Sequence, residues 1–173
     1  MEELDFNKLT DFHVHVGQFR EIYYNPHSIA SLILDKTGIG KIAVSSTSAG
    51  DPVYDPGKIL NEIAQLFKQY GKRIIHFFWV HPEFLPDDYF WRSLKIPVHG
   101  LKVHQQLFNW QKNPNSLERV FNIAQERNLP LLIHTGYDSI CSAGKYKSLI
   151  AKYQSVNITL AHGRPINEAL SCL

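Results

Sequence analysis

The chain has 173 residues, of which 44% are hydrophobic, so it can bury a globular core and does not have the composition of a disordered segment. Its net charge of +2, with the histidines neutral, is too small to indicate binding to nucleic acid or to an anionic membrane surface. With two cysteines, no long apolar run and no apolar leader at the N-terminus, we expect a cytoplasmic protein without a disulfide framework or a membrane helix.

Short apolar runs alternate with helical patterns along the whole chain. The first strand is expected at residues 12–16, followed by a polar loop. Five further strands are expected at residues 42–45, 73–80, 100–103, 130–133 and 156–161. The helices between and after them are expected to begin near residues 26, 55–56, 86–88, 115–116, 146 and 165. Six strand-then-helix units in strict alternation predict one α/β domain over residues 1–173, built on a parallel sheet.

Two architectures fit this alternation. One is an open doubly wound sheet, and the other is an incomplete (β/α)8 barrel of the TIM type with about six of its units present. Functional residues gather at the carboxyl ends of the strands in both. A Rossmann-like small-molecule enzyme is disfavoured, because no glycine-rich turn follows the first strand.

His13 and His15 are the strongest functional signal. Side chains alternate along a strand, so two histidines one residue apart point to the same face and can hold one metal ion between them. The alternative is a pair of core histidines bonded to the backbone. In a chain with nine histidines, one His-x-His pair can also arise by chance.

Three later apolar runs also end in basic side chains. One run carries Lys102 and His104, the next ends at His134, and the third ends at His162. A lone histidine after an apolar run is more often a core residue, but repetition in consecutive units favours a shared site. Four neutral imidazoles would leave a bound Zn²⁺ electrophilic enough to lower the pKa of a bound water to about 7.

Lys102 allows two interpretations. It is either a surface lysine at a strand end or an inward lysine, neutral or carboxylated, that bridges two metals. The residue types alone leave both open.

The segments around this cluster are candidates for substrate binding. His104 and His81 are expected to face a polar small-molecule substrate. The aromatic, amide-rich loop Gln105–Pro114 could contribute Phe108 and Trp110 as a lid, although both could equally pack on neighbours.

With these residues in place, the chain resembles the amidohydrolase superfamily, in particular its amidohydrolase-2 type of metal-dependent hydrolases. The matching segments, in the family's order, are residues 11–15, 100–104, 132–136 and 160–165. The resemblance implies a distorted TIM barrel with its metal at the carboxyl ends of the strands. It implies that His13, His15 and His134 bind the metal, and that His162 binds a second metal or the attacking water and substrate.

The resemblance also implies a reaction. Metal-bound hydroxide would attack a C–N or C–O bond of a small polar substrate, whereas some relatives decarboxylate instead. Zn²⁺ is the expected ion, with Mn²⁺ or a similar divalent ion as the alternative. His162 and Lys102 are then the candidate catalytic residues, and His104 and His81 the candidate substrate-binding residues.

The family pattern continues to a seventh and an eighth strand, and the eighth carries an aspartate that binds metal and acts as general base. This chain ends at Leu173, after the sixth expected strand, and no other residue matches that aspartate. A non-catalytic metal-binding chain or barrel fragment is therefore the alternative, since a missing base costs about 10²–10⁴-fold in rate. We also expect self-association through open barrel edges.

Overall fold

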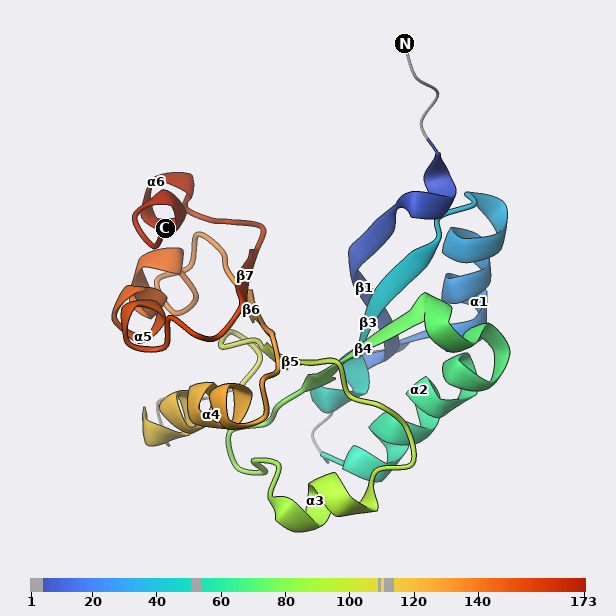
Figure 1. Ribbon diagram of the computed structural model, residues 1–173, viewed down its shortest axis with the longest axis horizontal. Helices are drawn as coiled ribbons and strands as arrows, with labels where there is room; N and C mark the ends of the chain where they lie inside the picture. Colours follow the sequence, from blue (N-terminus) through green and yellow to red (C-terminus); the bar gives the residue numbers. More distant parts are fainter. Residues whose placement is uncertain (1–4, 51–53, 109, 111–113) are drawn as a thin grey trace. The chain divides into compact units, whose positions relative to one another are not determined.

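The computed structural model describes residues 5–50, 54–108, 110 and 114–173 (Figure 1). Its Cα positions divide the chain into two compact units. The first is Met1–Phe77 with Lys95–Val98, and the second is Phe78–Leu94 with His99–Leu173. The expectation of a single domain over the whole chain stays a prediction.

The first unit is built on β1 (Thr10–Phe19), which pairs in parallel with β3 (Lys41–Ser46). β3 pairs in parallel with the start of β4 (Ile74–Trp79), through contacts such as Ile42 with Ile74. β3 and β4 lie where the apolar runs predicted them, within one residue at each end, and β1 includes the predicted residues 12–16.

The prediction of a polar loop directly after residue 16 is wrong. β1 continues to Phe19 and folds back as β2 (Ile22–Tyr24), which pairs antiparallel with β1. Arg20 makes this turn with a φ of 55°, and aromatic and β-branched residues on both sides favour an extended ladder over a loop.

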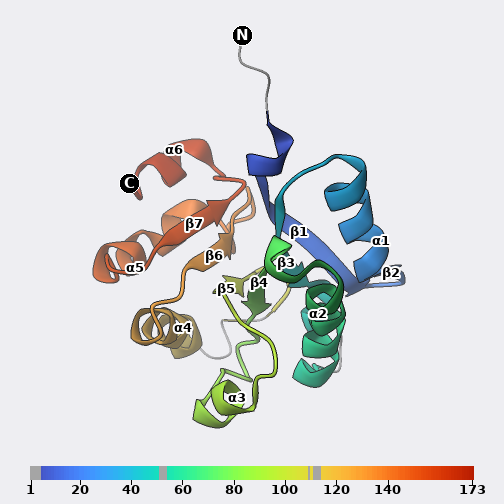
Figure 2. The same cartoon turned by 45° about the vertical axis from the view of Figure 1, so that its right-hand side comes forward.

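Two helical segments cover one side of these strands (Figures 1 and 2). The first is α1 (Pro26–Ala30), which continues as a π-helix over Ser31–Lys36 that the sequence did not predict. The second is α2 (Pro56–Tyr70), whose amino end is capped by the Asp55 carboxylate as its sequence predicts.

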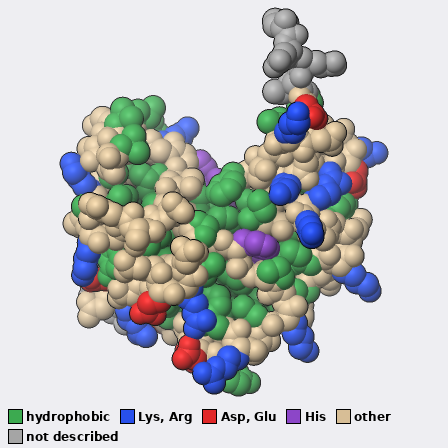
Figure 3. All heavy atoms as spheres, viewed as in Figure 1, with side chains coloured by type: hydrophobic (Ala, Val, Ile, Leu, Met, Phe, Trp, Pro, Cys, Tyr) green, Lys and Arg blue, Asp and Glu red, His purple; other side chains and the backbone are tan. Residues whose placement is uncertain are grey.

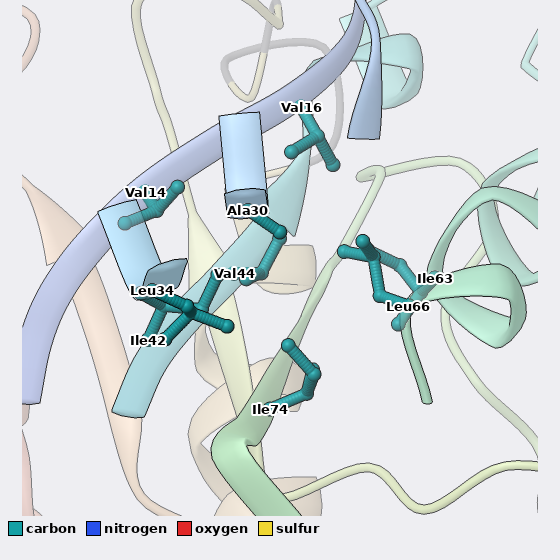
Figure 4. Packing of buried hydrophobic residues seen from close by; sticks show 9 residues of the cluster. All are labelled: Val14, Val16, Ala30, Leu34, Ile42, Val44, Ile63, Leu66 and Ile74. Carbon is teal, nitrogen blue, oxygen red and sulfur yellow. The ribbon is translucent and has the colours of Figure 1, made fainter. Parts of the chain in front are cut away.

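The core of this unit lies between the strands and the two helices (Figure 4). Val14 and Val16 of β1 and Ile42 and Val44 of β3 point into it at alternate positions, which is the period of a strand with one face on a core. Its members are Val14, Val16, Ala30, Leu34, Ile42, Val44, Ile63, Leu66 and Ile74. Because Val14 and Val16 are fixed in this core, the direction of the residues between and beside them is fixed too.

The second unit contains β5 (Gly100–Val103), β6 (Leu131–His134) and β7 (Ile158–Ala161). They pair in parallel in that order. The end of β4 also lies in this unit, where the Val80 amide donates to the Lys102 carbonyl over 2.9 Å.

Four helices follow the strand ends in this unit. They are α3 (Asp88–Ser93), α4 (Pro114–Glu126), α5 (Lys147–Lys152) and α6 (Ile166–Leu170). The expected cap of α4 at residues 115–116 is wrong, because the helix already begins at Pro114. Ser116 lies inside the first turn and donates to the Pro82 carbonyl over 2.9 Å, so its hydroxyl anchors the helix to a loop.

The predicted order of elements is confirmed over the described part of the chain. Six parallel strands are each followed by a helix, with β2 as the one added strand. Among the described residues, no helix combines the length and the apolar character needed to cross a membrane.

Candidate active site

His13 and His15 lie side by side on β1. Val14 and Val16 are buried in the core, while the two histidines are only half-buried, so the alternation places both imidazoles on the other face of the strand. Their ring centroids are 4.7 Å apart and their planes meet at 77°. The shared face expected from the His-x-His spacing is therefore confirmed.

Three of the other predicted site residues meet at the carboxyl ends of β5, β6 and β7. The rings of His104 and His134 stack with centroids 3.7 Å apart and planes only 8° apart. His162 follows β7, and its ring meets that of His134 edge-on at 5.1 Å. Consecutive parallel strands thus bring together side chains that lie about 30 residues apart in the sequence.

Lys102 points into the protein, so the surface interpretation of this residue is wrong. Its side chain is fully buried, and its Nζ lies 5.2 Å from the centroid of the Trp79 ring. Burial lowers the pKa of the Lys102 ammonium to about 7, because the charged form loses its solvation.

The sequence did not single out Trp79, which ends β4. Its indole contacts Lys102 from one side and stacks on His104, with centroids 5.4 Å apart and planes 15° apart. Trp79, His104 and His134 therefore form a continuous stack of three rings. A large aromatic residue at the end of a buried strand was the available signal.

Thr135 fixes the end of β6 against the turn that carries His162. Its hydroxyl donates to the Ala161 carbonyl over 2.6 Å and accepts the Arg164 amide over 3.0 Å. His162 itself has a φ of 69°, in the left-handed region, so the backbone leaves the extended path of β7 at this residue. The pKa of His162 is lowered, first by loss of solvent around the ring and then by the charges of Lys102 and Arg164.

His81 contacts two phenylalanine rings that are not part of the stack of Trp79, His104 and His134. Its ring meets Phe108 at 4.6 Å and Phe84 at 5.4 Å, and its Nδ1 accepts the Glu83 amide over 3.1 Å. Burial lowers the pKa of His81, and the Glu83 charge opposes this shift. Phe108 and Trp110 are buried, which agrees with the expected alternative in which they pack on neighbouring residues. Residues 109 and 111–113 of the same predicted substrate loop lie outside the described residues.

The predicted metal ligands fall in both units. His13 and His15 belong to the first, whereas His134 and His162 belong to the second. Within the described ranges, no three or more His, Cys, Asp or Glu side chains gather in a way that could hold a metal ion. The binding of one ion by these four histidines stays a prediction.

The visible surface carries no concentrated basic patch. Lys and Arg side chains are spread over the drawn face of both units, with acidic side chains among them (Figure 3). This distribution agrees with the net charge of +2.

Comparison with known proteins finds a similar solved structure but no match by sequence to a family model or a curated protein. No family model matches the chain, and no curated protein matches it. Among solved structures, the chain is similar to a probable 2-pyrone-4,6-dicarboxylic acid hydrolase from Acinetobacter baumannii, crystallised with citric acid. The TM-score is 0.60 at 14% identity, and the match covers 95% of this chain and 66% of that chain.

The two chains share a fold. At 14% identity the likeness establishes nothing beyond that, and this chain spans 66% of the length of its relative. Parallel strands that alternate with helices, together with this likeness, are consistent with part of an α/β barrel. The predicted α/β class is therefore confirmed, while the eight-unit barrel stays a prediction.

Proposed function

We propose that the chain is a metal-dependent hydrolase of the amidohydrolase type, acting on a C–N or C–O bond of a small polar substrate. The observation that carries the proposal is the row of Lys102, His104, His134 and His162 at the carboxyl ends of three consecutive parallel strands. The sequence motifs of that family and a fold shared with a probable hydrolase support it.

The proposed metal ligands are His13, His15, His134 and His162. Imidazole nitrogens suit Zn²⁺ and similar divalent ions, and each unit supplies two of them on neighbouring rings. A catalytic zinc site takes three protein ligands and keeps a further position open for water or substrate. A divalent ion held there would act as a Lewis acid and would lower the pKa of a coordinated water towards 7.

Lys102 and His162 are the groups proposed to move protons. With a pKa of about 7, Lys102 can gain or lose a proton at Nζ near neutral pH. The lowered pKa of His162 favours the neutral ring, which can accept a proton or bind a metal. His104 and His81 are proposed to contact the substrate.

A hydrolysis assay with matched variants tests this proposal. The purified chain, incubated with Zn²⁺ or Mn²⁺, is given 2-pyrone-4,6-dicarboxylate and a set of small lactones and amides. We expect ring opening that His134→Ala abolishes and that His99→Ala, an exposed histidine outside both histidine groups, leaves unchanged. Equal turnover by the wild type and His134→Ala would contradict the proposal.

Two other outcomes would favour the alternatives. Release of CO₂ without hydrolysis would indicate a decarboxylase related to this family. Bound metal with no turnover of any compound would indicate a non-catalytic metal-binding chain.

A further inference from the structure

A carboxylate is buried beside the end of β1. Glu62 lies on the core-facing side of α2 and is only 6% exposed, although an isolated buried carboxylate is costly. Two hydroxyls satisfy it: Ser46 Oγ donates to Oε2 over 2.5 Å, and Ser48 Oγ donates to Oε1 over 2.9 Å. All three side chains belong to the first unit.

Each hydroxyl also accepts a backbone amide. The Ser48 amide donates to Ser46 Oγ over 3.1 Å, and the Gln18 amide donates to Ser48 Oγ over 2.8 Å. Because both hydroxyl protons are committed to Glu62, the lone pairs are directed at these two amides. A chain of hydrogen bonds therefore runs from Glu62 through Ser48 to the backbone of β1, three residues after His15.

The backbone of β1 approaches this cluster very closely at Gly17. A Cβ at Gly17 would lie 2.6 Å from Ser46 Oγ and 2.7 Å from both Glu62 Oε2 and Ser48 Oγ. One residue earlier, the Thr47 hydroxyl donates to the Val16 carbonyl over 2.9 Å. The strand is thus hydrogen-bonded at Val16 and Gln18 and closely packed at Gly17 between them.

We propose that Glu62 is a positioning residue for the His13–His15 pair. Its carboxylate fixes the end of β1 through Ser46 and Ser48, and so adds to the packing of Val14 and Val16 in setting the direction of the two imidazoles. This inference rests on the proposed function, in which the two histidines bind metal. A well-packed apolar residue could stabilise the fold as well as a buried charge does. Stability alone therefore does not explain a carboxylate at this position, whereas a positioning role does.

The test compares Glu62→Ala and Glu62→Gln with Gln65→Ala, an exposed control on the same helix. Glutamine keeps the size but replaces one acceptor oxygen with a donor, so one serine hydroxyl loses its acceptor. Zn²⁺ binding is measured by calorimetry on the folded full chain. We expect about 10- to 100-fold weaker binding in Glu62→Ala, a smaller loss in Glu62→Gln and none in the control.

A second readout needs no metal. In the metal-free chain, hydrogen exchange at the Gln18 amide and the ring NMR signals of His13 and His15 are compared between Glu62→Gln and Gln65→Ala. We expect faster exchange and shifted ring signals only in Glu62→Gln. If Glu62→Ala does not fold, Ser48→Ala replaces it, because it removes one hydroxyl and keeps the packing.

The two readouts separate the two proposals. If the wild type binds no Zn²⁺, the proposed function fails, and the ring signals alone decide the role of Glu62. If the wild type binds Zn²⁺, unchanged affinity in a folded Glu62→Gln chain would overturn the inference. Ring signals and Gln18 exchange that match the control would overturn it in either case.

Discussion

Lys102→Met should change how the stability of the chain depends on pH. Methionine has a similar length and no charge, so it removes the cost of holding an ammonium group at a fully buried position beside Trp79. The pKa of Lys102 is lowered from 10.5 to about 7. Between these values the unfolded chain holds a proton that the folded chain has released, so the free energy of unfolding rises with pH.

The size of this effect follows from the shift. At about 1.36 kcal/mol per pKa unit, the drop from 10.5 to about 7 corresponds to about 5 kcal/mol. Below pH 7 both states are protonated and the full cost is present, so Lys102→Met should be more stable than the wild type there. The advantage should shrink as the pH rises from about 7 towards 10.5.

Urea unfolding of the chelator-treated chain from pH 6 to 10 measures this. The control is Lys68→Met, which replaces an exposed lysine on α2 and should leave the pH dependence of the wild type intact. Parallel curves for the wild type and Lys102→Met would refute the reasoning, because they would mean that Lys102 titrates alike in the folded and unfolded chain.

Two further substitutions test the first unit, both by urea or thermal unfolding against Gln65→Ala. Gly17→Ala should cost about 1–3 kcal/mol, since a φ of 88° strains any residue with a Cβ and the new methyl would meet three oxygens within 2.7 Å. A neutral or stabilising effect would mean that the strand end is not clamped as described. Leu66→Ala should cost about 2–5 kcal/mol, because Leu66 is fully buried in the core of the unit and its loss leaves a cavity. A cost below 1 kcal/mol would place Leu66 outside the tightly packed core.

The sequence predicted the strands well because buried parallel strands consist of short, continuous apolar runs. β5 lies at Gly100–Val103, where the sequence placed it, and the other parallel strands differ by a few residues at their ends. From strand order alone, the side chains at the carboxyl ends could be assigned to one edge. The contacts among His104, His134 and His162 agree with that reasoning.

What the sequence did not predict depends on contacts between distant residues. β2 is the exception, since it pairs with the end of β1 only three to seven residues away, and polar Gln18 and Glu21 beside the turn obscure its strand pattern. Ser46 and Glu62 are 16 residues apart, on a strand and a helix, and no spacing rule links them. The inward direction of Lys102 likewise shows only in its full burial and its contact with Trp79, whereas the residue type alone favours the surface.

The most direct measurement of the central claim is the stoichiometry of Zn²⁺ binding in the wild type, His13→Ala, His134→Ala and His99→Ala. We expect about one ion per chain in the wild type and in His99→Ala, with loss of high-affinity binding in both other variants, because His13 and His134 are both proposed ligands. Absence of binding in the wild type, or wild-type binding in His134→Ala, would contradict it.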